Sequence, residues 1–195
     1  MDARDMVALG RTGLSVSRLG LGAGLHRRPL RPRTRTAGRR HHRARLGAGH
    51  TALRHRVHDP DQDYPTAVTH AYRALAELLP LCAERGVAVM AAGVYQSGLL
   101  ADPRPGAPHG YWSVPRELGA RVRAIRAVCD RHAVPPLAAA LQFPLGHPAV
   151  VTVVVGARAP HEIAESAGLL AHPVPSAFWA ELKALGLLPE EAPTP

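Results

Sequence analysis

The strand-like run at residues 149–155 does most to restrict how this chain can fold. Its sequence, Ala-Val-Val-Thr-Val-Val-Val, is apolar or β-branched at every position and carries no charge. Such runs are typical of strands in parallel sheets, where both faces of the sheet are covered. Further strand and helix patterns alternate along the chain, which favours right-handed βαβ units. The sequence therefore predicts an α/β protein.

Local patterns extend this prediction. Residues 6–25 predict a short β-hairpin followed by a strand, because turn-forming Gly10 and Gly13 interrupt a series of apolar residues. Residues 86–92 predict a buried strand that runs into a glycine-containing turn. Ser176 is the expected N-cap of the last helix. Apolar residues at helical spacing predict helices at residues 68–79, 118–129, about 160–170 and about 177–185.

The positive charge of the chain sits in one segment. The net charge is +9, but residues 26–56 hold 11 arginines, five histidines and no acidic residue. The rest of the chain has 13 basic and 15 acidic residues, a net charge of −2. Because the segment has few large apolar residues, it cannot bury enough surface to offset the entropy of ordering. We expect residues 26–56 to be irregular.

Cysteine content and hydropathy indicate a cytoplasmic protein. Cys82 and Cys129 are too few for a disulfide framework and are expected to be buried thiols. No apolar run approaches the roughly 20 residues of a membrane span. The polar start at residues 1–5 fits neither a secretory signal nor a transit peptide. The histidines lack a spacing typical of zinc sites, so we expect no metal.

Residues 155–162, Val-Gly-Ala-Arg-Ala-Pro-His-Glu, combine the features of a phosphate site. A strand ends at Gly156, Arg158 follows, and a helix begins at a proline. Backbone N–H groups and the dipole at a helix start favour a phosphate, and an arginine can pair with it. In (β/α)8 barrels the phosphate site follows the last two strands. Alternatively, Gly156 only turns the chain and Arg158 is solvated, and the spacing alone leaves both readings open.

Two other motifs point less directly to a ligand. The glycines of residues 19–24 are spaced somewhat like a dinucleotide fingerprint, but His26-Arg-Arg-Pro cannot open a helix and no acid follows the glycines until Asp59. We therefore reject this reading and expect a strand with alternating glycines. His58 follows a short strand-like stretch at residues 53–57, where a histidine can donate a proton or bind a carbonyl. A single histidine is more often a surface residue.

The arginine-rich segment raises an alternative from another class of function, nucleic-acid binding. Its arginines could bind phosphate backbones through counterion release. However, residues 26–56 contain no aromatic residue and no module that reads DNA or RNA. Their proline and glycine also disfavour a basic helix. We therefore keep nucleic-acid binding only as the alternative.

Several phrases resemble the aldo-keto reductase family, and most of all its sugar dehydrogenase branch, the D-threo-aldose and L-fucose dehydrogenases. The opening Arg-Thr-Gly-Leu-Ser-Val-Ser-Arg-Leu-Gly-Leu-Gly at residues 11–22 is similar to the start of the family. The more specific phrases are His-Asp-Pro-Asp at 58–61, Leu-Pro-Leu-Cys-Ala-Glu-Arg-Gly-Val-Ala-Val at 79–89, Val-Tyr-Gln-Ser-Gly-Leu-Leu-Ala at 94–101 and Leu-Gln-Phe-Pro-Leu-Gly-His-Pro at 141–148.

The resemblance implies a partial TIM-type (β/α)8 barrel that binds NADP or NAD in extended form. Residues 1–25 would form the hairpin and first strand, and residues 57–195 the C-terminal part of the oxidoreductase domain. The nicotinamide end of the cofactor would lie near Tyr95 and Ser97. The adenosine phosphate end would lie at Gly156, Ala157, Arg158, Glu162, Glu165 and Ser166. Ser166 stands where the family often has asparagine, and Glu162 where it often has glutamine.

The resemblance also implies a catalytic group of aspartate, tyrosine, lysine and histidine, acting on a small aldose or aldehyde. Only the histidine maps onto this chain, as His58. The other three would fall within residues 26–56, which contain no Asp, Tyr or Lys, and the one lysine is Lys183. We expect the ancestral activity to be NAD(P)-linked oxidation of an aldose such as L-fucose, or reduction of an aldehyde. We expect this chain to be inactive.

The chain also lacks part of the barrel that it resembles. A (β/α)8 barrel needs about 250 residues, and this chain has 195. The resemblance skips from one helix to a later one between Leu78 and Leu79, so that strands five and six are missing. We infer a frameshift over residues 26–56 and a deletion, and we expect the exposed sheet edges to reduce stability. Translating the nucleotide sequence of residues 26–56 in the other two frames tests the frameshift.

Overall fold

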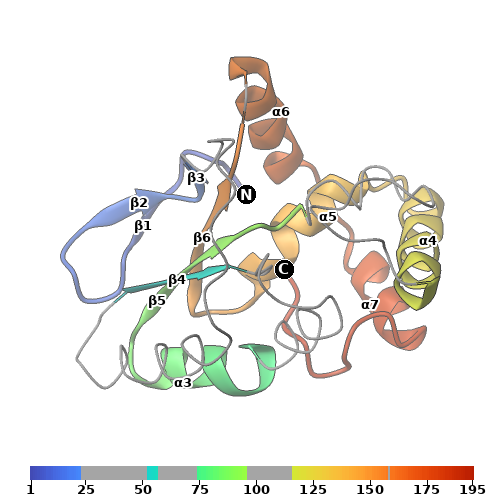
Figure 1. Cartoon of the computed structure of the whole chain (residues 1–195), viewed down its shortest axis with the longest axis horizontal. Coiled ribbons are helices and arrows are strands. Elements are labelled where there is room, and N and C mark those ends of the chain that lie inside the picture. Colours follow the sequence, from blue (N-terminus) through green and yellow to red (C-terminus); the bar gives the residue numbers. More distant parts are fainter. Residues whose placement is uncertain (23–51, 57–73, 96–115, 158) are drawn as a thin grey trace.

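The computed structural model describes residues 1–22, 52–56, 74–95, 116–157 and 159–195. A four-stranded sheet in the order β3-β6-β5-β4 forms its centre, and every neighbouring pair is parallel (Figure 1). The strands are β3 (Leu19–Leu21), β4 (Ala52–Arg56), β5 (Ala88–Ala92) and β6 (Val150–Val155). The predicted α/β class with a parallel sheet is confirmed.

Three helices pack against the sheet through one apolar core. They are α3 (Leu79–Glu84), which follows the π-helical stretch η1 (Ala74–Leu78), α5 (Pro136–Gln142) and α6 (Pro160–Ala171). Both β5 and β6 contribute residues to this core, which also contains Cys82, Leu141 and Leu170. Cys82, Leu141 and Leu170 are fully buried. Full burial of a leucine stabilises the fold by about 1.5–3 kcal/mol, so this core holds the three helices on the sheet.

A second core joins α4 (Arg116–Arg131) to α7 (Ser176–Ala184) beside the sheet (Figure 1). Phe178 and Trp179 of α7 pack edge to face, with ring centroids 4.9 Å apart. Arg131 and His132 both contact the carboxylate of Glu181. Hydrogen bonds from these two side chains hold the pKa of Glu181 below its usual range. The second core therefore combines aromatic packing with an ion pair at its rim.

A short hairpin precedes the sheet, as predicted. Its strands β1 (Met6–Ala8) and β2 (Ser15–Ser17) are antiparallel. Gly10 and Gly13 have φ of 56° and 76° in the turn between them, a region that favours glycine over residues with a side chain. The helix and strand predictions for residues 86–92, 118–129, 149–155 and 160–170 are confirmed as well. Cys82 and Cys129 are free and buried, as predicted.

Two local predictions are corrected. Residues 52–56, the end of the segment predicted to be irregular, form β4, because their backbone pairs with β5 at five successive positions. Backbone pairing does not depend on apolar side chains. Ser176 is the first residue of α7 and not its N-cap; Pro175 takes that position without a side-chain hydrogen bond. The rest of the arginine-rich segment lies outside the described residues.

The helix before β5 changes from a π-helix to an α-helix between Leu78 and Leu79, where the family resemblance skips two strands of the barrel. The π-helical stretch ends at Leu78 and the α-helix begins at Leu79. Pro80 stands in the first turn of α3 and has no N–H to donate to a carbonyl of the preceding π-helical turn. The change of helix type thus coincides with the junction inferred from the sequence.

We predict that two glycine substitutions will change stability in opposite directions. A Cβ on Gly146 would lie 2.8 Å from backbone atoms of Pro193 and Thr194, which cannot rotate away. Gly146→Ala should therefore reduce the free energy of unfolding by about 1–3 kcal/mol. Gly168, inside α6, has open space around it, so Gly168→Ala should raise that free energy by about 0.5–1 kcal/mol. Urea unfolding followed by circular dichroism tests both, and equal shifts in the two variants would contradict the prediction.

Candidate functional site

The carboxyl ends of β3, β5 and β6 meet at one edge of the sheet. β5 continues into a turn at Gly93, Val94 and Tyr95, and β6 continues into Gly156 and Ala157 before α6. The end of β3 is tied to the end of β6, because the N–H of Gly22 donates to the carbonyl of Val155 at 2.8 Å. In α/β folds this edge is where ligands bind, so it is the place to look for a site.

Gly156 leaves open space at this edge. A Cβ there would meet no atom within 4 Å, and its φ lies outside the left-handed region. By contrast, a Cβ on Gly22 would lie 3.2 Å from Val154. Neither crowding nor backbone strain within the described residues therefore requires glycine at position 156. The exposed backbone of Gly156 can be approached closely by a ligand.

The start of α6 lies directly beyond Gly156 and Ala157. Pro160 occupies the first turn, and no side chain caps the helix among the residues that are described. Glu162 lies in the same turn, half-buried, and its N–H donates to the carbonyl of Ala159 at 3.1 Å. The positive end of the α6 dipole thus faces the open edge of β6, an arrangement that favours an anion.

Tyr95 and Ser166 form a direct link between the β5 turn and α6. The hydroxyl of Tyr95 donates to the hydroxyl oxygen of Ser166 at 2.9 Å. The side chain of Tyr95 packs against the core beneath the sheet edge, and Ser166 is only 5% exposed. Burial raises the pKa of Tyr95, the hydrogen bond to Ser166 partly lowers it, and the nearby Glu165 carboxylate raises it further.

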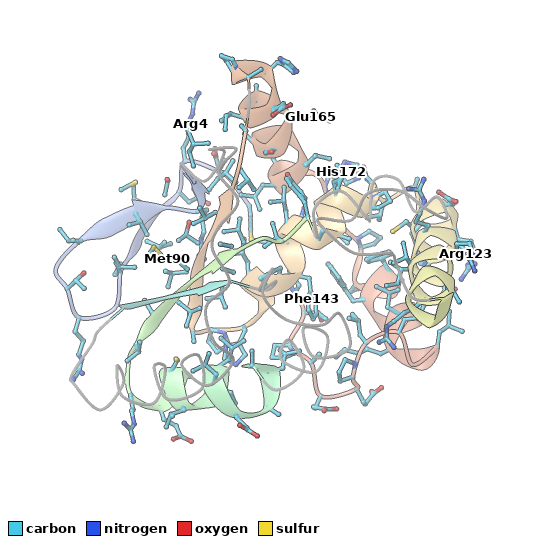
Figure 2. The ribbon with its side chains drawn as sticks, in the orientation of Figure 1. Arg4, Met90, Arg123, Phe143, Glu165 and His172 are labelled. Atoms are coloured by element: carbon cyan, nitrogen blue, oxygen red, sulfur yellow. The ribbon has the colours of Figure 1, made fainter. Side chains whose placement is uncertain are left out.

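Gln142 fastens the other end of α6. Its side-chain amide nitrogen donates to the carbonyls of Leu169, Leu170 and His172, at 3.2, 3.1 and 2.7 Å. These carbonyls belong to the last turn of α6 and to its C-cap residue, His172, where a helix leaves carbonyls without intrahelical partners; the carbonyl of Leu169 also accepts from the N–H of His172. Figure 2 shows His172 where α6 ends beside α5, and Glu165 nearer the start of the helix. Sequence reasoning missed Gln142, although a polar residue between Leu141 and Phe143 was a signal for it.

The structure brings together most of the residues that the family resemblance implies. Six of them are described and lie on the β5 turn, the end of β6 or α6, namely Tyr95, Gly156, Ala157, Glu162, Glu165 and Ser166. His58, Ser97 and Arg158 lie outside the described residues. Lys183 belongs to α7, a helix of the second core and not of this edge.

The described part of the chain offers neither a metal-binding cluster nor a membrane-spanning helix. No group of three or more His, Cys, Asp or Glu side chains there could hold a metal ion. No helix among these residues is both long and apolar enough to cross a bilayer.

Comparison with known proteins points to one family. Residues 57–186 match the sequence profile of the Aldo/keto reductase family. The chain is 41% identical over 113 residues to a pyridoxal 4-dehydrogenase of Microbacterium luteolum, covering 57% of this chain and 33% of that protein. It is 42% identical over 118 residues to a D-threo-aldose 1-dehydrogenase of Pseudomonas, covering 60% and 36%. The chain thus spans about a third of the length of these relatives.

A solved structure shares the fold. The apo form of an aldo-keto reductase from Bacillus halodurans superposes with a TM-score of 0.52 at 17% identity, covering 93% of this chain and 96% of that one. At this identity the likeness concerns the fold alone. It agrees with the predicted TIM-type α/β class, of which the described residues form a part.

We predict that Glu165→Gln will lower the pKa of Tyr95. The carboxylate of Glu165 disfavours the negatively charged phenolate, and its neutral amide would not. Alkaline titration followed by ultraviolet absorbance measures the ionisation of all tyrosines. Subtracting the curve of the Tyr95→Phe variant leaves the ionisation of Tyr95. Glu84→Gln makes the same change at an exposed position of α3 and should leave the titration curve unchanged. A Tyr95 pKa that stays the same or rises in Glu165→Gln would contradict the prediction.

Proposed function

Since this chain belongs to the aldo/keto reductase family, we propose that the carboxyl edge of its sheet binds NADP or NAD. The nicotinamide end would lie near Tyr95 and Ser97. The adenosine phosphate end would lie at Gly156, Ala157, Arg158, Glu162, Glu165 and Ser166. When bound, the nicotinamide ring would supply a site that gives or accepts hydride. We place this function in residues 57–195.

The single observation that supports the proposal most is the open space at Gly156. A glycine that neither packing nor its φ requires is expected where a ligand comes close to the backbone. The phosphate group of a nucleotide suits this position, because it would also lie at the positive end of α6. The described residues therefore fit the phosphate part of the cofactor.

The substrate that we propose is a small aldose or aldehyde. The two relatives are named as dehydrogenases of pyridoxal and of D-threo-aldoses, and the family consists of oxidoreductases. His58 is the residue that would contact the substrate. We further propose a cytoplasmic location, since both cysteines are free and buried and cytoplasmic thiols stay reduced.

We also propose that this chain does not catalyse the oxidation or reduction of its substrate. Proton transfer in the family needs a tyrosine with a lysine beside it, and residues 26–56, where both would fall, contain neither. A positioned general acid contributes typically a factor of about 10²–10⁴ in rate. His58 alone lacks the partners that would place and tune such a group.

We predict that Gly156→Ala will weaken cofactor binding without reducing stability. The added methyl meets no atom of the chain, so the free energy of unfolding should stay within about 0.5 kcal/mol. The same methyl would occupy the space left for the ligand, and the Kd of NADP⁺ should rise at least about tenfold. Isothermal titration calorimetry measures this, with Gly168→Ala, inside the helix that follows Gly156, as the control. Equal affinity in the two variants would remove Gly156 from the site.

We predict no oxidation of L-fucose by this chain with NAD⁺ or NADP⁺. The assay follows the absorbance of the reduced nicotinamide at several protein concentrations, against a blank without protein. A rate proportional to protein concentration would contradict the proposed inactivity. Loss of that rate in His58→Ala would then show that the reaction needs His58.

A further inference from the structure

One carboxylate closes the rim of the joint where α4 and α7 pack side by side (Figure 1). Glu181 of α7 accepts a hydrogen bond from Nε of Arg131 at 2.9 Å and a second one from Nη2 of the same side chain. Its other carboxylate oxygen lies 2.6 Å from Nε2 of His132. Arg131 is the last residue of α4 and His132 follows it directly. A single side chain of α7 thus holds two consecutive residues at the end of α4.

The backbone is strained immediately after these two residues. Ala133 has a φ of 53° and is the only residue other than glycine with a positive φ in the described part of the chain. This left-handed conformation costs free energy for a residue with a Cβ, and glycine adopts it readily. The N–H of Ala133 donates to the carbonyl of Asp130 at 3.3 Å, and the N–H of Val134 to that of Cys129 at 2.9 Å. These are the hydrogen bonds of a helix end that usually has glycine at the left-handed position.

Two kinds of contact hold this strained turn closed. Val134 is only 3% exposed and packs in the second core. The ring of His132 lies edge-on to the ring of Phe178, which is fully buried, with centroids 5.8 Å apart. The burial of Val134 does not depend on pH, whereas hydrogen bonds to Glu181 are strongest when its carboxylate is charged. One ionisable group therefore contributes to keeping the turn closed.

The charges around Glu181 give the direction of the pH effect. Among the described residues, Arg131 and His132 are the charged or titratable groups that face it, and Arg121, earlier in α4, donates instead to the carbonyl of Leu187 at 2.7 Å. The other segments packed in the second core contribute the apolar residues Ala139, Phe143, Val174 and Leu188. Hydrogen bonds from Arg131 and His132 lower the pKa of Glu181. A carboxyl whose pKa is lowered by folding stabilises the fold above its ordinary pKa and loses this effect as the pH falls through the lowered value.

We propose that Glu181 is an acid-sensitive switch, which keeps the strained turn at Ala133 closed and releases it when the carboxylate is protonated. Arginine stays charged at every pH and imidazoles become positive in acid, so two cations would then lie side by side without their shared anion. The turn relaxes, the end of α4 leaves α7, and the ring of Phe178 beneath His132 becomes exposed. Nothing in this switch requires a bound cofactor.

NMR of the full chain tests the state of the turn directly, because the Cβ chemical shift of an alanine depends on its backbone conformation. The signal of Ala133, identified by its loss in Ala133→Gly, should report a left-handed residue at pH 7. In acid it should move to the value of an ordinary loop, while the far-ultraviolet circular dichroism keeps its helical signal. Glu181→Gln should show the moved signal already at pH 7 and should not respond to acid.

Two further variants and one control complete the comparison. Arg131→Gln removes the main donor to Glu181 and should also move the Ala133 signal at pH 7, which provides a second variant if the first folds poorly. Glu84→Gln makes the same charge change at an exposed position of α3 and should titrate like wild type.

Dye binding tests the role of strain. The fluorescence of anilinonaphthalene sulfonate should rise in acid as Phe178 becomes exposed. Ala133→Gly removes the strain without touching Glu181, so it should shift this rise to lower pH by about one unit. The double variant with Glu181→Gln should bind less dye at pH 7 than Glu181→Gln alone.

Each of the following results would overturn the switch. The Ala133 signal stays left-handed in acid or in Glu181→Gln at pH 7. The signal moves only together with the loss of helical circular dichroism, which shows general unfolding. Glu84→Gln has the same effect as Glu181→Gln, or Ala133→Gly binds dye over the same pH range as wild type.

Discussion

The parallel pairing of β5 with β6 is the interaction on which the rest of the structure depends. Its register runs from Val89 opposite Val150 to Ala92 opposite Val154, with one shift between Val89 and Met90. The remaining strands add to its two sides, β3 to β6 and β4 to β5. Because both strands of the pair end at the same edge, the turn after β5 and the helix after β6 lie close together. Every described residue of the candidate site belongs to the turn after β5, to the end of β6 or to α6.

Polar side chains then hold α6 in place over this edge. Gln142 satisfies carbonyls at its carboxyl end, and Tyr95 contacts Ser166 nearer its start. Both Gln142 and Ser166 are buried, and a buried polar group that loses its partner costs about 1–3 kcal/mol. These bonds therefore favour one position of the helix over others. The same hydrogen bonds hold the start of α6 beside Gly156, at the edge where we propose the cofactor phosphate binds.

The chain combines a retained part of a family fold with a segment that departs from it. The matched residues, 57–186, supply β5, β6 and the helices around the candidate site. β4 comes from the arginine-rich segment and yet pairs with β5 over its whole length. A strand edge accepts any extended backbone of suitable length, because its hydrogen bonds come from main-chain groups. A segment without the family's catalytic residues can thus still contribute to the sheet.

The sequence alone determined the class of fold, the main helices and strands, the family and the segments that form the site. These follow from local patterns, such as the β-branched run at 149–155 and the motif around Gly156. Each such pattern is complete within a few neighbouring residues. Only the tertiary structure decided that Tyr95 contacts Ser166, that Gln142 caps α6 and that residues 52–56 pair with β5. The first contact joins residues 71 positions apart, and the second joins residues about 30 apart. Such pairs have no period or spacing in a single sequence, because they arise only when packed elements bring distant polar groups together.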